Sequence, residues 1–126
     1  MGRLDRDRSA SGPLIQAFSG NGFRIDQNVY EGGVKLTTEA VWPWTAPSSE
    51  ALAESDLLDL IDIDPVPEFI LLGTGATLRR PAVALTAALQ ARGVGLEVMD
   101  SRAAARTWGV LRGEGRWIAA ALMPLD

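Results

Sequence analysis

The chain contains no cysteine and no histidine among its 126 residues. Without cysteine there is no disulfide, no thiol nucleophile and no thiolate metal ligand. Without histidine the commonest general base and the commonest metal ligand are also missing. Ser-His-Asp triads, zinc proteases and histidine-dependent zinc deaminases therefore cannot be built from this sequence. Carboxylate, lysine or backbone-based catalysis stays formally open, so the sequence leans away from an enzyme, and we expect no metal and no cofactor.

Long apolar runs are missing as well. Glycine, proline or charged residues interrupt every candidate before it reaches the roughly 20 residues that cross a bilayer. The N-terminus MGRLDRDRSASG lacks both the apolar core of a signal peptide and the acid-poor character of a transit sequence. We therefore expect a cytoplasmic protein without an integral membrane segment, in which residues 1–13 form a flexible tail and residues 14–126 a single α/β domain.

The charge balance argues against nucleic acid as a partner. The chain has 12 basic and 16 acidic residues, which gives a formal net charge of -4. An acidic protein gains little from the phosphate backbone, the main source of nucleic-acid affinity. All the basic residues except Lys35 are arginine, which is well suited to carboxylates and phosphates, so a local anion site remains compatible with the sequence.

The first half of the domain is predicted to be antiparallel β-structure. Apolar and polar residues alternate in Phe23–Ile25 and in Val34–Leu36, as they do in strands with one buried face. Glycines at 32–33 separate the two segments and favour a turn or bulge. The segment Val41–Trp44 contains Pro43, which favours a short edge strand or a connection over a central strand.

The second half alternates helices with strands. Helical spacing of leucine and isoleucine predicts a helix that Ser55 caps. The apolar run FILL then predicts a strand buried on both faces. A helix starting at Pro81, the strand VGLEVM, a helix capped by Asp100 or Ser101, and the strand WIAAALM follow. The sequence thus predicts an α/β fold: a mixed sheet in which an N-terminal antiparallel meander precedes a C-terminal strand-helix-strand-helix-strand unit, with helices packed on the sheet.

The motif Gly73-Thr74-Gly75 lies between a predicted strand and a predicted helix, where phosphate-binding loops are found. Position 78 is leucine instead of the third glycine of a dinucleotide fingerprint, and the Gly-Lys pair of a Walker loop is absent. The motif is therefore more typical of a turn than of a cofactor site. A ligand site is the alternative, because parallel strands would bring this motif and Asp100-Ser101 to the same carboxyl edge of the sheet.

Two arginines strengthen that alternative. Arg102 and Arg106 are four residues apart, so they lie on one face of the predicted helix, where like charges destabilise it unless an anion compensates. A carboxylate of the chain itself, Asp100 or Glu114, is the simpler compensator, and an external anion is the other. The candidate ligand or anion crevice consists of Gly73, Thr74, Gly75, Asp100, Ser101, Arg106 and Thr107.

Tryptophan defines a second candidate surface. Trp42 and Trp44 flank Pro43, which removes a backbone donor, so the segment belongs at the rim of a sheet. The two rings either seal the domain core or offer an anchor to a protein partner, a role in which tryptophan is enriched. Trp108 is different, because its helical spacing with Ala104 and Leu111 predicts a core position.

Several segments in order resemble one known family. They are GFRI, Tyr30-Glu31-Gly32, the tryptophan at 44, LLGTG, GVGLEVMDSRAAARTWGVL and EGRWIAAALMP. The chain resembles, from Leu14 to Pro124, the family that includes the mitochondrial respiratory complex I assembly factor 3 and uncharacterised bacterial and archaeal proteins. One departure is Gly109, where the family usually has asparagine, and another is Trp108, where it often has tyrosine.

The resemblance implies a mixed sheet with flanking helices and brings no established activity or cofactor. Its mitochondrial member acts as a non-enzymatic assembly factor with a protein partner. We therefore expect a soluble, non-catalytic interaction protein that assists assembly of a respiratory or other membrane complex, with a respiratory subunit or a co-assembly factor as partner. The alternative is a small-ligand or anion-binding protein, or an enzyme, that uses the crevice at the carboxyl ends of the parallel strands.

Overall fold

The computed structural model describes residues 12–126, so nearly all of the predicted tail 1–13 lies outside the described residues. Pro13 is an exception, because it is buried and its carbonyl oxygen accepts a hydrogen bond from the indole nitrogen of Trp108 at 3.0 Å. The ring of Trp108 is fully buried, as its helical spacing predicted. Packing against Trp108 thus begins at a residue that the sequence placed in the tail.

The first strands form a separate three-stranded antiparallel sheet. Its order is β1 (Ile15–Ser19), β2 (Gly22–Ile25) and β3 (Asn28–Tyr30). Phe23 and Ile25 are buried whereas Arg24 between them is exposed, which confirms the predicted alternation. One face of this small sheet therefore faces the core and the other faces water.

A five-stranded mixed sheet forms the centre of the molecule. Its order is β5 (Val41–Trp44), β4 (Gly33–Leu36), β8 (Ala119–Leu122), β6 (Phe69–Gly73) and β7 (Gly95–Met99). Strand β6 is parallel to β7 and β8, while β4 is antiparallel to β5 and β8. The predicted α/β class and the parallel C-terminal unit are confirmed. The predicted meander is divided between two sheets, because β4 is buried along its whole length and needs a neighbour on both sides.

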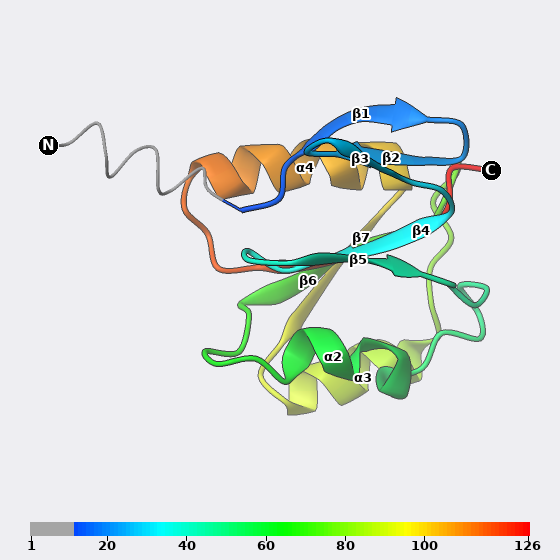
Figure 1. Cartoon of the computed structure of the whole chain (residues 1–126). Coiled ribbons are helices and arrows are strands. Elements are labelled where there is room, and N and C mark those ends of the chain that lie inside the picture. The colour runs from blue at the N-terminus through cyan, green and yellow to red at the C-terminus, as the bar shows by residue number, and fades with distance from the viewer. Residues whose placement is uncertain (1–11) are drawn as a thin grey trace, which may run out of the picture.

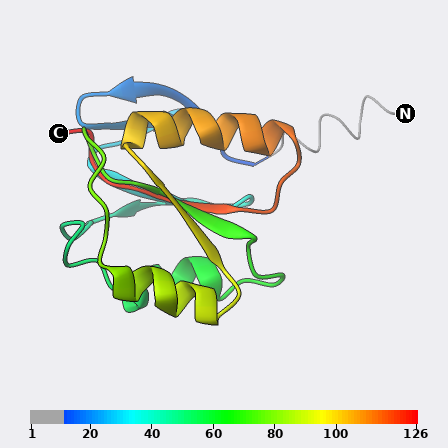
Figure 2. The same cartoon turned by 180° about the vertical axis from the view of Figure 1, so that it is seen from behind.

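Helices and the small sheet cover the two faces of the central sheet (Figures 1 and 2). Helix α4 (Ser101–Gly113) and the three-stranded sheet lie on one face. The 3-10 turn η1 (Glu54–Leu57) and the helices α2 (Leu58–Ile61) and α3 (Val83–Ala91) lie on the other. Two apolar clusters result, and alternate residues of β6 serve them: Leu71 belongs to the α4 side, and Ile70 and Leu72 belong to the α3 side.

Two predicted helix starts differ from the structure. Ser55 does not cap a helix; the backbone N–H of Ala53 donates to the Asp56 carboxylate at 2.8 Å, and the segment forms a 3-10 turn followed by one turn of α-helix. Pro81 precedes α3, which begins at Val83. Both segments carry the expected apolar spacing, but their ends are fixed by local hydrogen bonds that spacing does not reveal.

Candidate functional site

The Gly-Thr-Gly motif and the start of α4 meet at the carboxyl edge of the central sheet, as predicted. The parallel register places Gly73 beside Met99. The backbone N–H of Thr74 donates to the carbonyl of Met99, and the N–H of Ser101 donates to the carbonyl of Gly75, both at 2.9 Å. The two loops are therefore joined directly to each other.

Ser101 completes this junction. Its side chain is fully buried, and its hydroxyl accepts a hydrogen bond from the N–H of Gly75 at 2.8 Å and donates to the carbonyl of Met123 at 2.7 Å. One hydroxyl thus joins the ends of β6 and β8 to the first turn of α4. A buried hydroxyl that is satisfied as donor and acceptor stabilises this arrangement, because removing it would leave buried backbone groups unpaired.

Close packing explains Gly73, and backbone conformation explains Gly75. A Cβ atom on Gly73 would lie 2.8 Å from the Cα and the Oγ of Ser101. Gly75 has a φ of +97°, a backbone conformation that residues with a side chain rarely adopt. The glycines thus permit a tight junction, and the N–H groups of Thr74 and Gly75 are engaged within the protein.

Two further side chains close the surrounding turns. The hydroxyl of Thr74 donates to the carbonyl of Thr77 at 2.8 Å and accepts from the N–H of Arg79 at 3.0 Å. The carboxylate of Asp100 accepts from the N–H of Ala103 at 2.9 Å, which makes Asp100 the N-cap of α4. Of the two predicted caps, Asp100 is the one observed.

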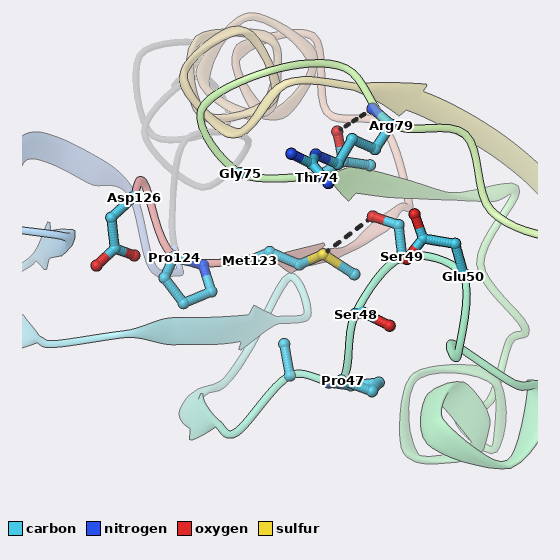
Figure 3. Close-up of a pocket in the computed structure, with 11 residues that line it drawn as sticks. Pro47, Ser48, Ser49, Glu50, Thr74, Gly75, Arg79, Met123, Pro124 and Asp126 are labelled. Carbon is cyan, nitrogen blue, oxygen red and sulfur yellow. Dashed lines mark hydrogen bonds between the residues drawn. The ribbon is translucent and has the colours of Figure 1, made fainter.

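A hollow of about 210 Å³ lies beside the junction (Figure 3). The loop after β5, the turn after β6 and the C-terminal segment form its walls. Its charged lining residues are Glu50, Arg79 and Asp126, and its neutral polar lining residues are Ser48, Ser49 and Thr74. Two carboxylates and one guanidinium suit a small ligand that has both a donor and an anionic group.

The other two members of the predicted crevice lie elsewhere. Arg106 lines a hollow between β1 and α4, and Thr107 lines another hollow with Met99 and Leu111. The structure therefore places Thr74 and Gly75, Arg106, and Thr107 at three different hollows. The reason is helix geometry: Arg106 and Thr107 follow the cap Asp100 by six and seven residues, so α4 has advanced by more than one turn, and successive side chains point to different sides.

The arginine pair on α4 has no carboxylate partner in residues 12–126. No ion pair joins Arg102 or Arg106 to a described acid. Asp100 is occupied as the helix cap, and Glu114 follows the last residue of α4. The expected compensation by Asp100 or Glu114 is thus not observed. Instead, the Arg102 guanidinium lies 5.6 Å from the centre of the Phe18 ring.

Trp42 and Trp44 lie on β5, at the edge of the central sheet, as the intervening proline predicted. Both rings are half-buried and pack against the apolar cluster on the α3 side. The pair thus contributes to the packing of this cluster, and a partly exposed rim remains along β5.

Lys35 is a buried residue whose importance the sequence did not indicate. The residue is only 4% exposed, and its ammonium donates to the two carboxylate oxygens of Asp59 at 2.8 and 3.0 Å. It also donates to the carbonyl of Asp56 and lies 5.2 Å from the centre of the Trp44 ring. The alternation of β4 predicted an exposed lysine. The buried ammonium is stabilised by groups more than 20 residues away in the sequence.

An exposed ion pair lies beside the N-terminal end of β6. Arg116 donates to both oxygens of Glu68, at 3.0 and 3.2 Å. The hydrogen bond from Arg116 lowers the pKa of the Glu68 carboxyl, and the same bond raises the pKa of Arg116. This pair lies at the opposite end of β6 from the Gly-Thr-Gly junction, so it does not contribute to the hollow there.

Residues 12–126 contain no group of three or more Asp and Glu side chains placed to hold a metal ion. None of the helices in the same part of the chain combines the length and the apolar character that a bilayer crossing requires.

These features define a small α/β domain in which a mixed five-stranded sheet has α4 and a small antiparallel sheet on one face and the other helices on the opposite face. The chain belongs to a family described as "Protein of unknown function (DUF498/DUF598)", whose model matches residues 15–123. The suspected family is thereby confirmed, because its curated members include proteins named as complex I assembly factors.

Three relatives show the range of the family. The chain is 34% identical to an uncharacterized protein of Rhodobacter capsulatus, over 95% of this chain and 92% of that protein. It is 31% identical to the protein named NADH dehydrogenase [ubiquinone] 1 alpha subcomplex assembly factor 3 of Danio rerio, over 92% of this chain and 67% of that one. The Homo sapiens protein of the same name is 29% identical over 92% of this chain, which spans 63% of its length.

Solved structures share the fold. A crystal structure of a Bordetella parapertussis protein has a TM-score of 0.81 and 29% identity, covering 91% of this chain and 98% of that one. A solution structure of a Bordetella pertussis protein, described as an Mth938-like domain, has a TM-score of 0.77 and 26% identity, covering 90% of this chain and 87% of that one. The predicted α/β architecture therefore agrees with experimentally determined relatives.

Proposed function

We propose that this protein is a non-catalytic interaction protein that assists the assembly of a respiratory, complex I-like membrane complex from the cytoplasm. The observation that carries the proposal is the similarity to proteins named as complex I assembly factors, which extends over 92% of this chain. The chain spans 63% to 67% of those two relatives, so the shared part is this α/β domain. Its partner is then a respiratory subunit or a co-assembly factor.

The site chemistry agrees with a role in binding. The sequence has no histidine or cysteine, and the best candidate for a phosphate-binding loop uses its N–H groups within the protein. Trp42 and Trp44, on the rim of β5, are the proposed contact surface, since half-buried tryptophans next to an open strand edge are typical interface anchors.

Deleting the gene in its own cells tests the proposal. We expect less assembled complex I on a native gel and in NADH-dependent quinone reduction, with recovery when the wild-type chain is supplied. Affinity capture from gently solubilised membranes should recover complex I subunits, and fewer of them with a Trp42→Ala or Trp44→Ala variant that remains folded. Normal levels of assembled complex in the deletion strain would overturn the proposal.

A small-ligand-binding protein is the second candidate, because the hollow beside the Gly-Thr-Gly junction lies at the carboxyl edge, where open α/β sheets bind ligands. Arg79 then takes the role that the sequence gave to Arg106. Phosphate, nucleotides and small carboxylates should raise the melting temperature of the wild-type protein and not that of Arg79→Ala. A wild-type melting temperature that none of these compounds changes would remove this candidate.

A further inference from the structure

We propose that the surface formed by Arg102 and Arg106 on α4 and Phe18 on β1 docks an acidic segment of a protein partner, whose apolar side chain enters the hollow between the two elements. We call this the α4–β1 surface. It rests on the proposed function only in taking the ligand to be a protein. The respiratory identity of that partner is not needed.

Charge is the first observation. Helix α4 contains three arginines and no acidic residue, in a chain with a net charge of -4. Arg102 and Arg106 are exposed and have no ion pair with an acid of residues 12–126. A concentrated positive patch on an acidic protein attracts a negatively charged partner and opposes a basic one.

Phe18 makes part of this surface rigid before any partner binds. Its ring packs edge to face against the buried ring of Phe23, with 6.2 Å between the centroids. The Arg102 guanidinium lies over the same ring at 5.6 Å, and Phe18 nevertheless remains 39% exposed. An arginine already held against an aromatic ring loses less conformational freedom on binding than a free one.

The hollow provides the apolar anchor. It has a volume of about 150 Å³ and is lined by Ile15, Gln16, Ala17, Phe18, Ala105 and Arg106. Protein cavities of about 150 Å³ can hold a benzene-sized group, so one leucine or phenylalanine side chain fits. Arg106 lies at this hollow, which brings a positive charge within reach of an acid next to that side chain.

Strand β1 provides the backbone for an extended segment. It is an edge strand of the three-stranded sheet, and within the described chain only β2 pairs with it. Edge strands commonly bind an additional extended peptide through their unpaired backbone groups. The α4–β1 surface thus combines an open edge, an apolar hollow and two positive charges.

Other ligands fit these observations less well. Two exposed arginines would hold a single small anion weakly, because water competes for both partners. Nucleic acid would meet an unfavourable overall charge. A segment that places acidic residues beside an apolar one satisfies the arginines and the hollow together.

The test uses the purified full chain and a labelled synthetic peptide in which glutamate alternates with leucine. We expect binding, measured by fluorescence anisotropy, that weakens as salt is raised. Arg106→Glu and Arg102→Glu should each weaken binding by about tenfold or more, because each replaces an attraction by a repulsion. The matched control is Arg80→Glu, a charge reversal at another exposed arginine outside this surface, which should change the affinity by less than about twofold.

A second pair of reagents tests the apolar anchor. Phe18→Ser should weaken peptide binding, and so should a peptide with serine in place of leucine, while circular dichroism shows that each protein variant stays folded. Equal binding of a peptide with lysine in place of glutamate would overturn the proposal. So would no binding of the acidic peptide, an equal loss with Arg80→Glu, full competition by inorganic phosphate, or Arg106-dependent binding to phosphatidylglycerol vesicles in place of the peptide.

This result is separable from the proposed function. Peptide binding that depends on Arg106, together with normal complex I in the deletion strain, would keep the docking surface and reject the respiratory role. A deletion strain that recovers fully with the Arg106→Glu chain, together with no binding of the acidic peptide by the wild-type chain, would keep the assembly role and reject this surface.

Discussion

The sequence assigns two regions of α4, around Ser101 and around Arg106, to one candidate ligand crevice, whereas the structure gives them different surroundings. At its first turn, Ser101 is buried and every hydrogen bond of its hydroxyl is made within the protein. One turn later, Arg106 is exposed and has no acidic partner in residues 12–126. The polar groups around Ser101, next to the glycine motif, are thus used to stabilise the fold. The exposed face around Arg106 remains accessible to a partner.

The comparison depends on the Ser101 hydroxyl, and its removal should cause the largest loss in the free energy of unfolding. Ser101→Ala leaves the N–H of Gly75 and the carbonyl of Met123 buried without their partner. At about 1–3 kcal/mol for each of these two unsatisfied groups, we expect a loss of about 2–6 kcal/mol in the free energy of unfolding, measured in urea.

The matched control is Ser55→Ala, which removes an exposed hydroxyl and should change stability by less than about 0.5 kcal/mol. Equal effects of the two substitutions would show that the junction is not the constrained region that the hydrogen bonds indicate.

Gly73→Ala should have the next largest effect. Its Cβ would lie 2.8 Å from the Cα of Ser101 and 2.9 Å from a methyl carbon of Leu122, and neither neighbour can move freely. We expect a loss of about 1–3 kcal/mol by urea denaturation, the usual cost of overpacking.

Gly109→Ala, in the middle of α4, is the opposite case. Apart from its chain neighbours and the adjacent backbone of its own helix, no atom lies within 4 Å of its added Cβ. Alanine is the better helix former, so this variant should gain about 0.5–1 kcal/mol. If Gly73→Ala were as well tolerated as Gly109→Ala, the motif would not be explained by close packing.

The sequence contained enough information for the fold class because strand and helix periods are local. Alternation in β2, the apolar run of β6 and the cap at Asp100 depend on neighbouring residues only. Burial of Lys35 depends on Asp59, which lies 24 residues away, so an alternating pattern gave the wrong expectation of an exposed side chain.

The candidate site was less predictable for the same reason. The sequence correctly placed Gly73 and Ser101 at one edge, since parallel strands fix that geometry. It could not show that Ser101 would occupy the N–H of Gly75, nor that Arg106 would line a different hollow. Such facts depend on which side chain fills a space, and periodicity does not specify this.

On the exposed face of α4, a substitution should change the free energy of unfolding only slightly. Arg106→Ala removes an exposed side chain, relieves the repulsion with Arg102 and introduces a better helix former. We expect the free energy of unfolding to stay the same or to rise by about 0.2–0.5 kcal/mol. A loss of more than about 1 kcal/mol would show that Arg106 is a structural residue and would weaken the contrast with Ser101.

The exposed Glu68–Arg116 pair should give the smallest effect, visible only as a pH dependence. The hydrogen bond from Arg116 lowers the pKa of Glu68 in the folded state below its ordinary value of 4.5. The pair therefore stabilises the protein above that value, and the stabilisation is lost as pH falls through the lowered pKa. Urea unfolding of wild type and Glu68→Gln should differ slightly at neutral pH and converge in acid. High salt should reduce the difference, because exposed pairs are screened. A difference that persists in acid would assign the effect to packing of the side chain, and this surface would then resemble the Ser101 junction more than the open face of α4.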